Sequence, residues 1–460
     1  MSIAKKFFGD KAFYKMVLAI TVPIIIQNGI TNFVTFLDNI MVGQLGAEAL
    51  SGVGIANQMI FIYSLCLFGG LAGAGIFTAQ FFGKNDQKGV QYTFRFKLLT
   101  AVAITVVGFC ILVPFGDELI SLFLTDTDPE LDIELTLALG RDYLKVVLLS
   151  LIPLALTQVY SSTMRETGQT IVPMVASVIA VLTNALFNYL LIFGAMGFPE
   201  LGVVGAAVGT IISRVVEFAI VVIWAHTHPK KVPYIKGVYS SLYIPRTLFC
   251  QMGVKTVPLL FNELMWSGGM TVLTQCYSTR GLVAVAAVNI ATTISNLFNI
   301  VYISMGTAVA IVVGGQLGAG QIEEAKDTDR KIITFSILLC IGLGTFMALL
   351  APAFTSIYKV SDDVKSLAAT LIVIYAMLMP FHSFMHNCYF TLRSGGKTFI
   401  TFLFDSAFIW GVNVPVGLIL SRLTDIAILP LFISCVSVEL IKCVIGAVLL
   451  KTGKWAHKLV

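Results

Sequence analysis

Residues Val22–Ala56 read VPIIIQNGITNFVTFLDNIMVGQLGAEALSGVGIA, and residues Val257–Ala291 read VPLLFNELMWSGGMTVLTQCYSTRGLVAVAAVNIA, a diverged second copy of the same pattern. A second pair of segments repeats later in each half, with TMRETGQT at Thr163–Thr170 and TLRSGGKT at Thr391–Thr398. Matching segments in the same order indicate an internal repeat. The chain therefore consists of two related halves, and the fold of one half predicts that of the other.

The composition is that of a membrane protein. The 460 residues are 57% hydrophobic and 12% charged, with a mean hydropathy of +0.89, whereas soluble domains are about a quarter charged. Apolar stretches of the length that crosses a bilayer recur from end to end. We place twelve spans at Met16–Leu37, Leu50–Gln80, Leu98–Phe115, Leu139–Ser161, Ile171–Phe193, Val203–Ala225, Val254–Tyr277, Val283–Val313, Ile332–Ala351, Leu367–Phe390, Phe399–Leu420 and Ile428–Leu450.

The basic residues indicate the orientation of these spans. Most of the 30 Lys and Arg fall at the termini and in alternate connections, such as Lys84–Lys97 and Lys230–Arg246. Loops rich in Lys and Arg stay on the cytoplasmic side. We therefore expect a multi-pass protein of the cytoplasmic (inner) membrane with both termini cytoplasmic and the loop Thr125–Leu139 external.

Each half contributes six spans, so the two halves have the same topology. The predicted fold is all-α, with two six-helix bundles related by a parallel pseudo-two-fold repeat. Residues 1–225 form the N-terminal lobe, 226–250 a cytoplasmic linker and 251–460 the C-terminal lobe. Two like bundles around a central path are typical of alternating-access transporters. A membrane enzyme would show clustered catalytic residues, which this sequence lacks, and a scaffold would not need buried acids.

The remaining composition excludes several other classes. The eight cysteines are scattered singly, without the paired spacing of a metal site or disulfide framework. The formal net charge of +5 arises in short loops and is explained by membrane topology, so we expect no nucleic-acid partner. The expected partners are the lipid bilayer and small-molecule organic substrates. We expect a monomer without a cofactor.

Ionisable residues inside the spans are the candidates for function, because each costs at least ~2.5 kcal/mol at mid-bilayer. Asp38 lies near the outer end of the first span. Asn184 and Asn188 share one face of the fifth span and Thr210 lies on the sixth, at similar depths of roughly 8–14 Å from the outer ends. Carboxylate, amide and hydroxyl oxygens suit a hard monovalent cation, and the carboxylate could instead carry a proton. The residues alone leave open that Asp38 is interfacial and that the asparagines only join helices.

The second half offers a different set. Glu263 and His382 lie at matching depths near the cytoplasmic side, and this predicts a pair that suits a proton or a cationic compound, or a structural hydrogen-bonded pair. Spacing at i and i+3 predicts same-helix ion pairs Arg214–Glu217 and Glu439–Lys442. Asp405 is expected to reach the membrane surface or Lys397. An apolar and aromatic substrate cavity has the candidates Phe33, Phe36, Met59, Trp266, Met270, Met305 and Trp410.

Seven segments together resemble the MATE (multidrug and toxic compound extrusion) family over nearly the whole length. The loop Phe81–Gly89 lacks the Gly, Asp and Arg-rich signature of the major facilitator family, which also has six plus six helices. The segments that carry the MATE resemblance are Thr21–Gln58, the glycine-containing ends Gln80–Gly83 and Gln316–Gly320, Met164–Thr170, Asn184–Gly194, Gly202–Arg214 and Leu392–Thr398.

The resemblance implies an antiporter that exports small organic, often cationic, compounds in exchange for Na⁺ or H⁺. It implies a cation site at the residues matching Asp38, Asn184, Asn188 and Thr210. Glu263 matches an acid that helps bind a cation in some members, but those members carry Asp where this chain has His382. An alternative within the same superfamily is a flippase of lipid-linked substrates. Such a cavity is often rich in arginine, whereas the interior of these spans contains only Arg214.

Overall fold

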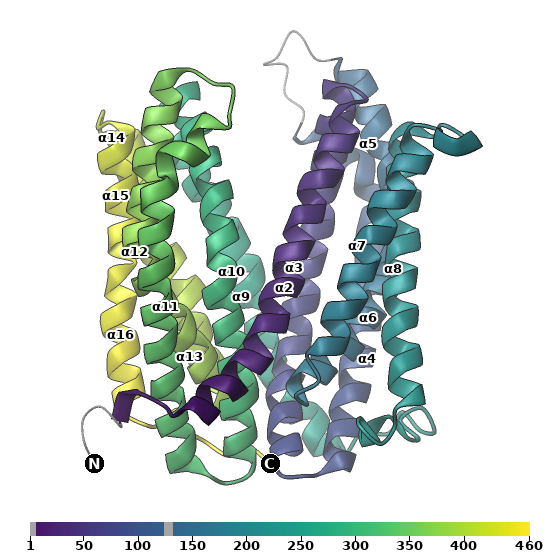
Figure 1. The fold of residues 1–460 in the computed structure, drawn as a ribbon, viewed down its shortest axis with the longest axis vertical. Coiled ribbons are helices and arrows are strands. Elements are labelled where there is room, and N and C mark those ends of the chain that lie inside the picture. Colours follow the sequence, from purple (N-terminus) through teal and green to yellow (C-terminus); the bar gives the residue numbers. More distant parts are fainter. Residues whose placement is uncertain (1–5, 124–131) are drawn as a thin grey trace. The chain divides into compact units, whose positions relative to one another are not determined.

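The computed structural model describes residues 6–123 and 132–460, apart from the side chains of Thr35 and Phe36, and every regular element in these residues is helical (Figure 1). The helices are α2 Lys11–Gly43, α3 Ala47–Gly83, α4 Gln87–Ser121, α5 Ile133–Val147, η1 Leu148–Ser150, α6 Leu151–Glu166, α7 Ile171–Ile192, η2 Ala195–Gly197, α8 Gly202–Thr227, η3 Pro233–Ile235, α9 Arg246–Ser278, α10 Leu282–Gly318, α11 Ile322–Ser356, α12 Asp362–Ser394, α13 Thr398–Phe402, η4 Leu403–Ala407, η5 Ile409–Asn413, α14 Val414–Leu423, α15 Ile428–Val438 and α16 Leu440–Lys451.

These elements form twelve spans, because α5 continues through η1 into α6, α13 continues into α14, and α15 continues into α16. Eleven of the spans in the described residues are long and apolar enough to cross a membrane. The remaining one, α9, has 33 residues and carries Lys255, Asn262 and Glu263, which make it more polar. The predicted all-α membrane fold with twelve transmembrane helices is confirmed.

Two interruptions of the spans have an identifiable cause in proline. A proline has no N–H to donate, and its ring clashes with the carbonyl four residues earlier. Pro153 follows the 3₁₀ turn η1, and Pro415 follows the π-helical turn η5. Tighter or wider turns at these positions remove the clash without ending the span.

Part of the predicted external loop Thr125–Leu139 is helical. Residues 124–131 lie outside the described residues, and α5 begins at Ile133, so that 133–139 are helical. The Asp132 side chain accepts a hydrogen bond from the Leu135 backbone N–H and caps this helix. An acidic N-cap followed by a helix-forming segment is a start signal, and the hydrophobicity pattern alone placed the start of this span too late.

One compact unit, here called the N-terminal unit, comprises Ile26–Thr78 and Gln87–Gly253. Within it α7 packs along α8, while α5 and α6 also contact α8, and α4 contacts α5 and α6 (Figure 1). A Cβ at Gly205 would lie 2.4 Å from the Leu191 carbonyl oxygen, and so glycine is required where α8 approaches α7.

The segment after α8 is folded onto this unit. Between Thr227 and Arg246 the chain forms turns and η3. Arg95 of α4 donates to the carbonyl oxygens of Val238 at 2.8 Å, Tyr243 at 3.0 Å and Gly237 at 3.2 Å. The predicted linker is therefore an ordered strap held to α4.

The other unit, here called the C-terminal unit, comprises Val254–Val460 with Ala79–Asp86 and the described residues up to Ile25. In it α10, α11 and α12 pack on one another, and α16 packs on α12 (Figure 1). One buried cluster joins α12 to α15 and includes Leu371, Ile372, Leu431 and Phe432. Both units are discontinuous in sequence, because the start of α2 and the end of α3 join the C-terminal unit.

Residues after α16 bind the end of α3 within the C-terminal unit. The Gln80 side chain accepts from the Leu459 backbone N–H at 2.7 Å, and it donates to the carbonyl oxygens of Ser394 at 3.1 Å and His457 at 3.2 Å. Gln80 is fully buried. One side chain thus joins three segments that are far apart in the sequence.

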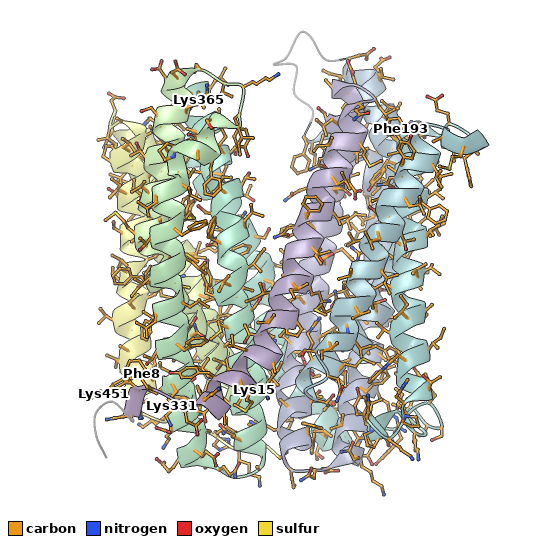
Figure 2. All side chains as sticks on the ribbon, in the orientation of Figure 1. Phe8, Lys15, Phe193, Lys331, Lys365 and Lys451 are labelled. Carbon is orange, nitrogen blue, oxygen red and sulfur yellow. The ribbon has the colours of Figure 1, made fainter. Side chains whose placement is uncertain are left out.

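The basic residues of the C-terminal unit follow the predicted alternation. Lys15, Lys331 and Lys451 lie at one end of this unit, and Lys365 lies at the opposite end (Figure 2). By this alternation the first three fall at the termini or in a connection predicted to be cytoplasmic, and Lys365 falls in a connection predicted to be external. Which end faces the cytoplasm stays a prediction.

Candidate functional site

Two facing stripes of polar side chains on α7 and α8 form the base of the candidate site. Along α7, Ser177, Asn184 and Asn188 recur at helical spacing and are all buried. Along α8, Thr210 and Glu217 are two turns apart on one face. A Cβ at Gly209 would lie 2.2 Å from Asn188 Oδ1, and so glycine at this position leaves room for that amide.

Asp38 of α2 completes this polar cluster. Its Oδ1 accepts a hydrogen bond from Asn188 Nδ2 at 2.6 Å. Asn188 Nδ2 also lies 3.4 Å from Asn184 Oδ1, and Asn184 Nδ2 lies 3.4 Å from Thr210 Oγ1. The structure thus brings together all four residues that the sequence analysis grouped as a cation site.

The cluster contains an oxygen without a hydrogen-bond partner. Asn188 Oδ1 is buried and accepts no hydrogen bond in the described residues. An orphaned buried acceptor costs free energy unless a cation or another donor reaches it. Together with the Asp38 carboxylate and the Thr210 hydroxyl, it supplies the oxygen chemistry that a small monovalent cation prefers.

A cavity of about 80 Å³ adjoins these side chains. One water occupies about 30 Å³ of the liquid, and the cavity therefore has room for a small cation with one or two waters. Its lining comes from α2, α7 and α8, and consists of Thr31, Val34, Asp38, Ser177, Ala180, Val181, Asn184, Thr210, Ser213, Arg214 and Glu217.

A second acid lines the same cavity. Arg214 donates to Glu217 Oε2 at 2.9 Å, which confirms the predicted i, i+3 ion pair. Ser177 donates to Glu217 Oε1 at 2.7 Å, and Gln27 of α2 donates to Ser177 at 2.9 Å. Arg165 of α6 donates from Nη1 to Gln27 Oε1 at 3.4 Å.

Ser177 and Gln27 were not among the site residues predicted from the sequence. Ser177 was detectable, because it lies seven residues before Asn184 and hence on the same face of α7. Gln27 gave no comparable signal, since its role depends on which helix packs against α2. A further buried pair was also missed, because Lys97 of α4 had been assigned to a loop and in fact pairs with Glu166.

The C-terminal unit holds a separate polar network around Glu263. Tyr389 donates to Glu263 Oε1 at 3.1 Å. Asn262 lies 3.3 Å from the Tyr389 hydroxyl and donates to Asp405 Oδ2 at 3.1 Å. Lys442 donates to Asp405 Oδ1 at 3.2 Å. The expected contact of Asp405 with Lys397 is therefore wrong.

The predicted Glu439–Lys442 ion pair is also wrong. Glu439 lies at the junction where α15 ends and α16 begins, and the regular helical spacing on which the prediction relied is broken there. Its carboxylate accepts from Asn413 Nδ2 at 2.8 Å and lies 3.7 Å from His382 Nε2. Asp405 and Asn413 belong to the π-helical turns η4 and η5.

The structure gives Glu263 and His382 different neighbours. Glu263 is bound by Tyr389, and His382 faces Glu439. The two residues belong to one unit, but they do not contact each other as the predicted pair. Among the described residues no group of three or more His, Cys, Asp or Glu side chains gathers in either unit, and any cation here depends on single acids assisted by amides and hydroxyls.

The candidates for the substrate cavity differ widely in how far their side chains are buried. Phe33 is exposed and Met270 is at the surface, while Met59 is buried. Met305 is fully buried in a core cluster of the C-terminal unit and offers no open surface there. Trp410 is partly exposed and donates from its ring to the Met265 carbonyl oxygen at 2.8 Å. Trp266 packs beside the core, and the side chain of Phe36 lies outside the described residues.

Comparison with known proteins identifies the family. The sequence profile of the MatE family matches residues 23–190 and 258–419. The chain is 24% identical over 450 residues to the probable multidrug resistance protein NorM of Thermotoga maritima, covering 97% of this chain and 94% of the relative. It is 23% identical over 421 residues to the probable multidrug resistance protein YoeA of Bacillus subtilis, covering 90% of this chain and 88% of that relative.

Solved structures agree with this relationship at the level of the fold. The outward-facing conformation of a multidrug resistance MATE family transporter of the MOP superfamily matches with a TM-score of 0.83 and 20% identity, covering 100% of both chains. A crystal structure of MATE in the bent conformation matches with a TM-score of 0.84 and 19% identity, covering 99% of this chain and 98% of that one. The chain belongs to the MATE family of multidrug efflux transporters, and it is a membrane transporter and not an enzyme.

Proposed function

We propose that this protein is an antiporter that exports small organic, often cationic, compounds across the cytoplasmic membrane in exchange for Na⁺ or H⁺. It works as a monomer with both termini in the cytoplasm, and it binds the coupling ion at Asp38, Asn184, Asn188 and Thr210. The two sequence-defined lobes, residues 1–225 and 251–460, move as the alternating parts, joined by residues 226–250.

The observation that carries this proposal is the 2.6 Å hydrogen bond between Asn188 and Asp38 beside a cavity of about 80 Å³. A carboxylate inside a membrane protein is costly unless it is paired or has a role. Asp38 has an amide donor and a cavity beside it. A cation or proton that enters this cavity neutralises the carboxylate, and its departure restores the charge.

This cycle can couple ion entry to export. A bound ion changes the charge of the site, and the change favours one arrangement of the helices that line it over another. Because α2, α7 and α8 all contribute to the cavity, their relative positions depend on its occupant. The energy of the ion gradient is then available to move the substrate.

Glu263 has a different proposed role. It lies in the C-terminal unit, where the Tyr389 hydroxyl donates to it, and it adds a negative charge among apolar helices. A carboxylate in such surroundings attracts an organic cation over many ångströms. We assign Glu263 and His382, which have different neighbours in this unit, to substrate binding and not to Na⁺ binding, since imidazole is a poor ligand for Na⁺.

Transport in proteoliposomes tests the proposal. The purified protein is reconstituted, and an outward gradient of Na⁺ or of H⁺, with the ion more concentrated inside the vesicles, is imposed separately while uptake of one cationic and one neutral fluorescent compound is followed. One of the two gradients should drive accumulation against the substrate gradient. Accumulation that is equally fast without either gradient would contradict antiport.

A further inference from the structure

The cavity beside Asp38 contains three charged groups. Asp38 and Glu217 are acids and Arg214 is a base, and all three line the same space. Their charges sum to minus one when all are ionised. Since an unbalanced charge within a bilayer is costly, one additional positive charge makes this space neutral. The next cation, Arg165, does not line the cavity and is joined to Gln27 instead.

Glu217 is the fixed member of the ion pair. Its side chain is 7% exposed, and its second oxygen accepts from Ser177 at 2.7 Å. Ser177 is itself held by Gln27 at 2.9 Å. Hydrogen bonds of this kind stabilise the ionised carboxylate and fix its position.

Arg214 is the adaptable member. Its side chain is 33% exposed, and it contacts Glu217 through Nη1. A guanidinium group carries five N–H donors in a planar fork, and it can bind two carboxylates through different nitrogens. Arg214 lies one turn from Thr210 on α8, between the level of Glu217 and the level of the Asp38 cluster.

We propose that Arg214 is a built-in counter-ion of the cation site, which pairs with Glu217 while a cation occupies Asp38 and turns towards Asp38 when the cation leaves. This inference rests on the proposed function and adds residues to its site. The exchange lowers the cost of releasing the cation, because Asp38 is not left without a positive partner. The charge balance also limits the site to one bound cation, since a second would give the cavity a net positive charge.

Variants that change the charge of the cavity should strengthen or weaken cation binding in a direction that the proposal specifies. Arg214→Gln changes the sum from minus one to minus two, and it should tighten cation binding about tenfold and slow release. Glu217→Gln changes the sum to zero and frees Arg214 to neutralise Asp38, and it should weaken cation binding about tenfold. The double variant restores minus one, and its binding midpoint should return to within about threefold of the original.

The measurement is binding of Na⁺ to the purified full chain in detergent, with choline replacing Na⁺ to keep ionic strength constant. A parallel arm without Na⁺ follows proton uptake, and it replaces the first arm if the coupling ion is H⁺. A matched control is the pair Arg141–Asp117, which is joined at 2.8 Å in the N-terminal unit and does not line the cavity. Arg141→Gln and Asp117→Asn should leave the midpoint unchanged.

Thermal unfolding of every variant separates this role from simple structural support. A purely structural ion pair predicts that both single variants lose stability while their cation midpoints stay equal, or shift in the same direction, and that result would overturn the proposal. Opposite shifts with recovery in the double variant support it. Loss of ion binding in Asp38→Asn together with equal midpoints in the Arg214 and Glu217 variants would remove this inference alone. Unchanged ion binding and efflux in Asp38→Asn would remove the proposed function as well.

Discussion

Lys442 of α16 donates to Asp405 Oδ1 across 3.2 Å, and this bond connects the last helix to the π-helical turn η4 of the helix before it. Lys442 is buried, and Asp405 also accepts from Asn262. The spacing along the sequence had assigned Lys442 to Glu439. Through the observed ion pair, Lys442 instead connects the last two spans of the C-terminal unit.

Removal of one partner should therefore be more harmful than removal of both. Lys442→Met leaves Asp405 without its positive partner inside the unit, and we expect a loss of about 2 kcal/mol in the free energy of unfolding. Lys442→Met combined with Asp405→Asn leaves no unpaired charge and should recover most of that loss. Thermal unfolding in detergent measures both. Equal instability of the double variant would show that each side chain acts independently of the other.

Asp38→Asn should abolish ion-coupled efflux in a folded protein. Asparagine is nearly isosteric, and it removes only the negative charge and the site for a proton. If Asp38 merely anchored α2, its neutralisation would relieve the cost of a charge in the membrane and transport would be little affected. Drug resistance of cells, corrected for the amount of protein in the membrane, measures the effect. Full resistance with Asp38→Asn would disprove its role in coupling.

The two units should respond differently to Na⁺. Asn184→Ala removes a side-chain oxygen without changing the charge, and it should raise the Na⁺ concentration for half-maximal efflux by about tenfold, the effect of one lost contact of roughly 1.4 kcal/mol. Glu263→Gln should instead weaken transport of a cationic compound more than that of a neutral one, because it removes an attractive charge. Efflux rates against Na⁺ concentration for both compounds measure these effects. A shifted midpoint in Glu263→Gln alone would reverse the assignment of the units.

The close approach of α8 to Asn188 gives a way to disturb the site without removing any ligand. A Cβ at Gly209 would lie 2.2 Å from Asn188 Oδ1. Gly209→Ala should displace this amide from Asp38 and weaken ion coupling at least about tenfold, with the protein still inserted. Gly54→Ala is the matched control, because a Cβ there has no atom within 4 Å. Equal efflux by the two variants would show that the position of the amide is unimportant.

Membrane topology can be tested with single cysteines at positions on opposite predicted sides. Lys365→Cys should react with an impermeant maleimide added outside the cell, because it lies in a connection predicted to be external. Lys231→Cys, in the strap after α8, should react only after the membrane is opened. The native cysteines are replaced by serine beforehand, since Cys110 and Cys250 are exposed. The opposite pattern of labelling would invert the predicted orientation.

The sequence allowed prediction of the helices better than of their contacts. Length and hydropathy located all twelve spans, because the bilayer demands an apolar segment of nearly constant length. The grouping of Asp38, Asn184, Asn188 and Thr210 was also accessible, since their depths follow from helical rise and the family motif covers them. Both the spans and the depths of these residues can be read from the position of each residue along its own helix.

The network of the C-terminal unit was not accessible in this way. Asp405 lies in a π-helical turn, and a wider turn rotates the following side chains away from the directions that the regular spacing predicts. Glu439 lies at a helix junction, which has the same effect. Predictions based on i and i+3 spacing succeeded for Arg214 and Glu217 on the regular helix α8, and failed where the helix was irregular.

The bonds of Gln80 have a consequence for how the protein is made. Gln80 belongs to the second span, which leaves the ribosome early, whereas two of its three partners are backbone groups of His457 and Leu459. These residues follow the last span and are synthesised after all twelve helices. While the ten later spans are being inserted, the side-chain amide of Gln80 therefore lacks its hydrogen bonds to His457 and Leu459. The end of α3 thus completes its hydrogen bonds only after the last residues of the chain have been made.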